Sequence, residues 1–459
     1  MPKQKSHYSL PEWSSLPIGP DGISEGQAEQ LHLAAITAAR RLGVAENGVL
    51  ARGFRKLETK QVCGIISVPG ISLEILPKLT DEDGALRATL VRMIAVAFDI
   101  PLSEGQIAQM GAQESDLLEA FINLFVTRLA EQAKSGLTRD YVPEEDVLPK
   151  LRGALDVRQQ IVRRSVDPSR LHCRFDELSE NTPLNRLFKT SLLRIISFVR
   201  SEPLRRRIAN LTGRFTNIPA SPAPLRERVV WNRMNERFRQ AHMLARMLLE
   251  AEWQNTSSGH GTGISLLFPM NLLFERYVAR WLQRVLPPGS VSVQRRQHTL
   301  LQHGAYPLIP DIVIDTPDGP LVIDTKWKDL GEHSGSTPNV SQADLYQLAS
   351  YGAAYNASRV ILFYPSIKQK LAPTTWRYTA TNLRVDIWQV DLALAKQTCN
   401  WKDIAQDIVN HAEHHFPLRK TRKAAFFDEH SMPRIRIRRS VLSSDFLMNT
   451  NRGGDFQSN

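Results

Sequence analysis

The spacing of apolar residues divides the chain into a strand-rich first part, a helical middle and a mixed last part. Residues 26–42 have the three-to-four spacing of an amphipathic helix, and residues 49–79 predict several strands with a turn at residues 69–70. Helical spacing returns in four further stretches, at residues 85–98, 115–135, 185–200 and 231–253. The pattern predicts an α/β protein with a helical region between two strand-containing parts.

A polar, glycine-rich stretch at residues 255–263 separates the helical middle from the last part. The elements expected beyond it are a helix at 268–282, strands around 310–314 and 321–326, a helix at 344–352, and strands at 359–365 and 383–389. In the first of these helices we expect Leu272, Tyr277, Trp281 and Leu282 to pack against the core.

The two strands around residues 310–326 carry the residues of greatest chemical interest. The proline and Asp-Gly residues of the intervening segment 315–320 favour a chain reversal, so the strands are expected to form a hairpin. Alternate residues of a strand share a face, which makes Asp324 and Lys326 neighbours. Antiparallel pairing then brings Asp311 close to both of them.

This grouping suits a divalent metal ion and a phosphodiester. Two adjacent carboxylates, here Asp311 and Asp324, repel each other unless a cation lies between them. Mg²⁺ prefers such hard oxygen ligands, retains several waters and can activate one of them for attack on phosphorus. Lys326 would orient and deprotonate that water or stabilise the developing charge, and the Thr325 carbonyl is a further candidate ligand.

The two flanking helices offer supporting residues. Glu275 on the first helix can reach the metal, although a surface pairing with Arg276 or Arg280 is the alternative. Gln347 and Tyr351 on the second helix are four residues apart and share a face. They would bind DNA phosphates or brace the lysine, and the alternative for Tyr351 is packing against the sheet.

The ordered set Glu275, Asp311, Asp324-Thr-Lys326 and Gln347-x-x-x-Tyr351 resembles the PD-(D/E)xK nuclease superfamily. The fuller resemblance is to the McrC family, the nuclease subunit of McrBC-type modification-dependent restriction systems. It is carried by several further segments within roughly residues 50–400. These are Gly64-Ile-Ile, Leu73-Glu-Ile-Leu-Pro-Lys78, Leu151-Arg-Gly153-Ala-Leu-Asp156 and Phe175-Asp-Glu-Leu-Ser-Glu-Asn-Thr-Pro-Leu-Asn185-Arg.

The resemblance implies an activity, a cofactor and a partner. McrC-like proteins cut DNA with Mg²⁺, while a partner AAA+ GTPase drives translocation, reads 5-methylcytosine and is stimulated by the nuclease subunit. The chain has no Gly-x-x-x-x-Gly-Lys-Ser/Thr segment, so we expect it to bind no nucleotide and the partner to use the GTP. Asp311, Asp324 and Glu275 would be metal ligands.

The resemblance also gives a domain division. We expect a mixed, partner-binding domain at residues 1–155, a helical connecting region at 156–255 and a PD-(D/E)xK α/β core at 256–418. A basic tail at 419–459 has no counterpart in the family pattern, and it is either an arm that adds DNA affinity, a strand that pairs with a partner, or an end without a role.

Composition agrees with a polyanionic partner. The 459 residues carry a net charge of +11 and a pI near 9.6, which favours nucleic-acid binding. Arg295 and Arg296, just before the acid-bearing strands, are the preferred phosphate contacts, and solvated surface is their alternative. Three scattered cysteines, the absence of a long apolar run and the polar amino terminus favour a cytoplasmic protein without a membrane span.

Two other functions fit the same residues. One is a scaffold that docks on a GTPase ring and regulates it while its own cutting site stays idle, although the complete acid–acid–lysine set argues against this reading. The other is a stand-alone PD-(D/E)xK repair or junction nuclease, which would cut without nucleotide or partner.

Overall fold

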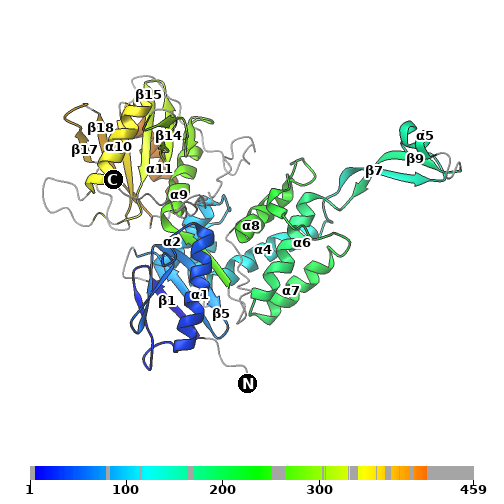
Figure 1. The fold of residues 1–459 in the computed structure, drawn as a ribbon, viewed down its shortest axis with the longest axis horizontal. Coiled ribbons are helices and arrows are strands. Elements are labelled where there is room, and N and C mark those ends of the chain that lie inside the picture. Colours follow the sequence, from blue (N-terminus) through cyan, green and yellow to red (C-terminus); the bar gives the residue numbers. More distant parts are fainter. Residues whose placement is uncertain are drawn as a thin grey trace, which may run out of the picture.

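The computed structural model of the chain describes residues 6–78, 83–112, 116–163, 169–250, 264–301, 304, 306–328, 330, 340–357, 359–366, 374–381, 383–392 and 397–410. Figure 1 shows an amino-terminal sheet and helix, a helical bundle with a projecting arm, and a carboxy-terminal sheet with helices. The mixed α/β class and the strand-rich amino-terminal region are therefore confirmed. The expected boundary at 255–263 and the tail at 419–459 lie outside the described residues.

A four-stranded sheet forms the centre of the amino-terminal unit. Its strands are β1 (Ser6–Pro11), β6 (Ile71–Leu76), β5 (Val62–Val68) and β10 (Ile264–Pro269), in that order. β1 runs parallel to β6, and the other pairs are antiparallel. The helix α1 (Glu25–Leu42) begins with a Ser24 capping box and packs Leu31 against the sheet residues Ile66 and Leu73.

A smaller sheet lies beside the first one. It has the order β2-β4-β3, formed by β2 (Ser15–Pro17), β4 (Lys56–Thr59) and β3 (Leu50–Gly53). The predicted turn at residues 69–70 joins β5 to β6, with Gly70 in the left-handed region at φ 85°. The strand prediction for residues 49–79 is therefore confirmed.

The helical part contains six longer helices and three short 3₁₀ turns among the described residues. The helices are α2 (Asp83–Ala97), α3 (Glu104–Ala112), α4 (Leu117–Ala133), α6 (Pro183–Ile195), α7 (Glu202–Gly213) and α8 (Arg239–Glu250). The turns are η1 (Ile196–Phe198), η2 (Pro224–Arg226) and η3 (Glu236–Phe238). Phe125, Phe188 and Phe238 pack together where α4, α6 and η3 meet.

The predicted helix at 231–253 is wrong over its first turns. The residues before Arg239 form turns and η3 instead. Asn232 and Asn235 explain the difference, because their side-chain oxygens accept hydrogen bonds from Met234 N and Asn232 N, both at 2.9 Å. Such local bonds satisfy backbone groups in a non-helical conformation.

An arm built on a three-stranded sheet projects from the helical bundle (Figure 1). It consists of β7 (Asp140–Leu148) paired along its whole length with β9 (Leu171–Ser179), the short β8 (Ala154–Leu155) and α5 (Val157–Arg163). Its base is fixed by Asn185, a fully buried residue of α6 whose amide nitrogen donates to Thr138 O and Glu180 O at 2.8 Å each.

The carboxy-terminal sheet has six strands. In order they are β11 (Val291–Val293), β14 (Ile312–Thr316), β15 (Gly319–Thr325), β16 (Arg359–Ser366), β18 (Arg384–Asp391) and β17 (Thr374–Arg377). β15, β16 and β18 are parallel neighbours, and the remaining pairs are antiparallel. A short hairpin of β12 (His298–Thr299) and β13 (Pro307–Leu308) lies outside this sheet.

Helices cover both faces of the carboxy-terminal sheet. Ile323 and Ile361 belong to the same hydrophobic cluster as Phe274 of α9 (Met270–Val285) and Trp401 of α11 (Gln397–Asn410). Alternate sheet residues such as Val322 belong to a second cluster with residues of α10 (Gln342–Tyr355). The expected helices and strands of this part are therefore present. No helix in the described ranges is long and apolar enough to cross a membrane.

One packing prediction in α9 is wrong. Tyr277, Trp281 and Leu282 are buried as expected, but Leu272 is 38% exposed and Leu273 and Phe274 take its place in the core. Leu273 and Phe274 precede Tyr277 by four and three residues and share its face of the helix, whereas Leu272 precedes it by five residues and lies off the buried stripe.

Candidate functional site

The β14–β15 hairpin brings the two predicted aspartates together. The turn is tighter than expected, since β14 continues to Thr316 and only residues 317 and 318 lie outside the strands. Ile312 pairs with Ile323, so Asp311 lies one residue before β14 and next to the end of β15. Oδ2 of Asp311 accepts hydrogen bonds from Thr325 N and Thr325 Oγ1, both at 2.7 Å.

Lys326 lies directly beside Asp324, as strand alternation predicts. Its Nζ is 2.8 Å from Asp324 Oδ2 and 3.5 Å from Asp344 Oδ1. Asp324 is only 2% exposed, while the lysine is half-buried. The backbone of Lys326 is fixed as well, because its N–H donates to Phe363 O of the parallel strand β16 at 2.9 Å.

Gln347 and Tyr351 of α10 form a relay that holds the lysine. Lys326 Nζ donates to Gln347 Oε1 at 3.1 Å, Gln347 Nε2 donates to the Tyr351 hydroxyl at 2.7 Å, and that hydroxyl donates to Ile309 O at 3.1 Å. Tyr351 thus braces the lysine through Gln347 and also packs on the sheet, while the predicted contact with DNA phosphates stays a prediction. The relay connects α10 to the segment that leads into Asp311.

Glu275 approaches the aspartates from α9 on the other side of the sheet. It is 5% exposed and accepts a hydrogen bond from Gln294 Nε2 at 3.1 Å. The surface pairing weighed for it is not formed, because Arg280 pairs with Asp99 at 3.2 Å and the Arg276 guanidinium lies over the Phe98 ring.

Three carboxyl groups therefore share one buried region, and the pKa of each is raised above its usual value. Burial and the charge of Asp311 raise the pKa of Glu275 to about 8 and that of Asp324 to about 7. Burial also raises the pKa of Asp311, against the hydrogen bonds from Thr325. Burial alone would lower the pKa of Lys326, but Asp324 beside it raises that pKa above its usual value.

The chemistry of these donors fits a hard divalent cation. All three acids offer carboxylate oxygens, and each ionises more easily if a positive charge lies among them. Within the described part of the chain, no group of three or more His, Cys, Asp or Glu side chains is already arranged to hold a metal ion. Mg²⁺ does not require one, since it usually binds through one or two carboxylates together with water and phosphate oxygens.

The two predicted DNA contacts differ in their surroundings. Arg295 forms a bidentate pair with Asp315, with Nη1 2.9 Å from Oδ1, and its Nη2 also donates to Ser292 Oγ at 2.8 Å. Arg296 is exposed. Arg296 is thus the more accessible of the two, and Arg295 fixes the end of the hairpin.

Four residues at the site were not found from the sequence. They are Gln294 beside Glu275, the Thr325 side chain on Asp311, Asp344 beside Lys326, and Trp327. Only Asp344 had a sequence signal, its position three residues before Gln347 on the same helix. The other three depend on contacts between segments distant in the chain.

The fold and the site together define a mixed α/β protein with an acid–acid–lysine cluster at the end of a sheet hairpin. The chain matches the family model described as "McrBC 5-methylcytosine restriction system component" over residues 57–365, more than half of its length. The chain belongs to this family. The match confirms the resemblance to McrC-type subunits that the sequence motifs indicated.

Solved structures add a likeness in fold. The chain resembles a chain of the half-complex from the tetradecameric assembly of Thermococcus gammatolerans McrB AAA+ hexamers with bound McrC, with 21% identity and a TM-score of 0.62. That match covers 88% of this chain and 100% of the other. A second match, to the Thermococcus gammatolerans McrBC complex, has 24% identity and a TM-score of 0.48, and covers 61% of this chain and 88% of the other. A search of curated proteins found no match.

Proposed function

We propose that the chain is the Mg²⁺-dependent endonuclease subunit of a McrBC-like, 5-methylcytosine-dependent restriction system. The observation that carries the proposal is the cluster of Asp311, Asp324 and Lys326 at the end of the β14–β15 hairpin, with Glu275 facing it from α9. The order of antiparallel hairpin, crossover helix α10 and parallel strand β16 is consistent with a PD-(D/E)xK core.

Asp311, Asp324 and Glu275 are the residues that would hold Mg²⁺. When bound, the metal supplies a water nucleophile and stabilises charge on the phosphate. Asp311 is held in place by the backbone and side chain of Thr325, and Glu275 by Gln294. These hydrogen bonds fix the carboxylates before the substrate arrives, which lowers the cost of organising the site.

Lys326 acts as a cation in this proposal. Its pKa is raised above the usual lysine value, so the amine is protonated at neutral pH and cannot take a proton from water. It is suited instead to orienting the attacking water and to stabilising the negative charge that develops on phosphate. Gln347 and Tyr351 hold it in the orientation that points toward Asp324.

The motor is expected to be another chain, an AAA+ GTPase. This chain has no phosphate-binding loop sequence, and the solved assembly that it resembles in fold contains McrB AAA+ hexamers with bound McrC. GTP would thus be used by the partner and not by this chain. The basic net charge supports double-stranded DNA as the shared substrate.

The arm is the surface that best suits the GTPase partner. It lies at the opposite end of the long axis from the carboxy-terminal sheet, with α5 at its tip (Figure 1). Its side chains include seven exposed large apolar groups: Tyr141, Leu151, Leu155, Val157, Ile161, Val162 and Leu178. A projecting element with this much exposed apolar surface typically marks a protein interface.

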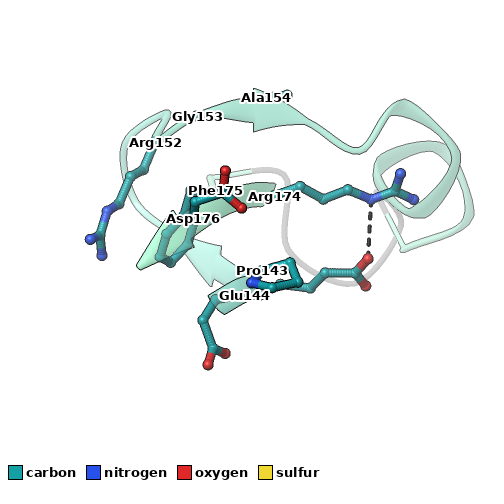
Figure 2. A pocket seen from close by; sticks show the side chains of 9 residues that line it. Pro143, Glu144, Arg152, Gly153, Ala154, Arg174, Phe175 and Asp176 are labelled. Atoms are coloured by element: carbon teal, nitrogen blue, oxygen red, sulfur yellow. Dashed lines mark ion pairs between the residues drawn. The ribbon is translucent and has the colours of Figure 1, made fainter. Parts of the chain in front are cut away.

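The three strands of the arm add a polar hollow to this surface. A pocket of about 510 Å³ lies among β7, β8 and β9, and Figure 2 shows that Arg174, one of its lining residues, forms an ion pair. Arg174 Nε is 3.1 Å from Glu145 Oε1, and the Arg152 guanidinium stacks 4.0 Å above the Phe175 ring. Paired opposite charges beside exposed apolar side chains favour a protein partner over DNA for the arm, because DNA binding calls for unpaired positive charge.

The proposal is tested by reconstituting the chain with its GTPase partner, GTP and Mg²⁺ on methylated and unmethylated DNA. Cleavage of the methylated DNA that needs all three additions is expected, and Asp324→Ala should abolish it while partner binding is retained. Cleavage without nucleotide or partner would favour a stand-alone nuclease. GTPase stimulation with no cleavage by the wild-type chain would favour the scaffold reading.

A further inference from the structure

Trp327, which follows Lys326, is held by the amino-terminal unit. Its indole Nε1 donates to Glu12 Oε1 at 2.7 Å, and its carbonyl oxygen accepts from Gln61 Nε2 at 2.7 Å. The ring is 5% exposed and packs against Phe274 with centroids 5.6 Å apart. Phe274 is the neighbour of Glu275 in α9. Trp327 therefore connects the amino-terminal unit to the two segments that carry the proposed catalytic residues Lys326 and Glu275.

Glu12 is an unusual partner because it is a carboxylate buried to 2% exposure. Besides Trp327, its Oε1 accepts from the backbone N–H of Lys78 at 3.2 Å, and its own N–H donates to Leu76 O at 2.8 Å. Burying an acid is costly unless hydrogen bonds compensate. The Glu12 oxygen is thus the acceptor that holds the Trp327 indole at this joint.

Gln61 ties the second catalytic segment to the end of the amino-terminal sheet at which Glu12 also lies. Its carbonyl oxygen accepts from Met270 N at 3.2 Å, and its side-chain amide donates to Asn271 Oδ1 at 3.2 Å. These residues form the first turn of α9, the helix that carries Glu275. The preceding strand β10 pairs with β5 up to Pro269 opposite Val62, so α9 starts directly from the amino-terminal sheet.

We propose that Glu12, Gln61 and Trp327 form a joint through which the amino-terminal unit positions Lys326 and Glu275 for cleavage. Glu12 and Gln61 are positioning residues in this scheme, and neither touches the substrate. The inference rests on the proposed nuclease function for its activity readout. Its structural readout, the exchange of backbone amides beside Trp327, does not depend on that function.

The central test is Trp327→Phe. This change keeps a ring against Phe274 but removes the N–H, which leaves the Glu12 carboxylate without its side-chain donor. The matched control is Trp281→Phe in α9, because the Trp281 Nε1 is buried with no hydrogen-bond partner among the described residues and its ring stacks on Trp401. Both variants lose the same atoms, but only one of them loses a hydrogen bond.

In the complex with partner, GTP and Mg²⁺, we expect Trp327→Phe to lower kcat about 10- to 100-fold with little change in the KM for DNA. Misplacement of catalytic groups has this signature, because DNA contacts remain intact. In the full-length chain without metal, hydrogen exchange should be faster at the amides of residues 325–328, including the Lys326 N–H bonded to Phe363 O. Trp281→Phe should behave as wild type in both measurements.

A second pair of variants covers the case in which Trp327→Phe does not fold. Glu12→Gln keeps an oxygen acceptor for the indole, so its kcat and its exchange rates at residues 325–328 should stay within about threefold of wild type. Glu12→Leu keeps the volume but removes the acceptor, so its kcat should fall and exchange at the same amides should be faster. Circular dichroism and thermal unfolding confirm that the variants compared are folded.

Equal kcat and equal hydrogen-exchange rates in Trp327→Phe and Trp281→Phe would contradict the proposed joint. A Glu12→Leu variant that behaves as wild type would contradict it as well. Failure of the nuclease proposal looks different. In that case the wild-type complex does not cleave, while faster exchange in Trp327→Phe alone still supports the joint.

Discussion

Asp311 accepts two hydrogen bonds from Thr325, the residue that lies between Asp324 and Lys326. This contact closes the end of the β14–β15 hairpin and fixes one carboxylate against the next strand. It also orients the side chains on either side of Thr325 toward the same region. The spacing of the cluster thus depends on a threonine whose side chain takes no direct part in the proposed chemistry.

The first prediction concerns pH and metal. The folded pKa of Glu275, about 8, and that of Asp324, about 7, lie above their usual values of 4.5 and 3.8, so the folded state binds more protons between those limits. Stability of the metal-free protein should therefore be greatest on the acidic side of this window and decrease as pH rises to about 8. Mg²⁺ should restore it at pH 8, which thermal unfolding with and without Mg²⁺ will measure.

Asp324→Asn tests the cause of that pH dependence. Removing one of the repelling charges should stabilise the metal-free protein at pH 8 by an amount on the order of 2 kcal/mol and remove most of the stabilisation by Mg²⁺. Asp21→Asn, at an exposed loop position, is the control and should leave both unchanged. A variant less stable than wild type at pH 8 without metal would contradict the electrostatic account.

The third prediction concerns the role of Lys326. Lys326→Ala should lower the cleavage rate about 10²- to 10³-fold while binding of the partner and of DNA is retained, because a positioned positive charge acts mainly on the transition state. Lys328→Ala is a matched control, since Lys328 pairs with the same Asp344 at 2.9 Å but is exposed. Single-turnover cleavage assays distinguish the two, and equal rates would argue against a catalytic lysine.

The fourth prediction concerns the arm as the partner surface. Ile161 in α5 is 71% exposed, so Ile161→Ser should leave the fold unchanged while weakening partner binding about tenfold or more, the value of burying one large aliphatic side chain. Leu33→Ser, at an exposed position of α1, is the control. Binding measured by calorimetry decides the question, and equal affinities for both variants would place the interface elsewhere.

The fifth prediction concerns the base of the arm. Asn185→Ala leaves the carbonyls of Thr138 and Glu180 without their donor in a buried setting, which should cost about 2–4 kcal/mol. Asn181→Ala, near the same turn, removes only an exposed hydrogen bond from Arg186 to Asn181 Oδ1 and should cost less than about 1 kcal/mol. Chemical denaturation of the two variants compares these values directly.

The sequence alone determined much of the cluster at the hairpin. Period-two alternation placed Asp324 beside Lys326, and turn residues placed Asp311 opposite them, because strand geometry and chain reversal depend on neighbouring residues. The four-residue spacing of Gln347 and Tyr351 likewise predicted a shared helix face, which the hydrogen bond between them confirms. The start of α8 was missed because two asparagine side chains compete locally with the helix.

Only the tertiary structure decided which distant segments meet at this site. Gln294 bonds to Glu275, Glu12 bonds to Trp327 across 315 positions of sequence, and β10 completes a sheet begun by the first strands of the chain. Periodicity states which side of an element is apolar, whereas the partner of that side is selected by the packing of the whole chain.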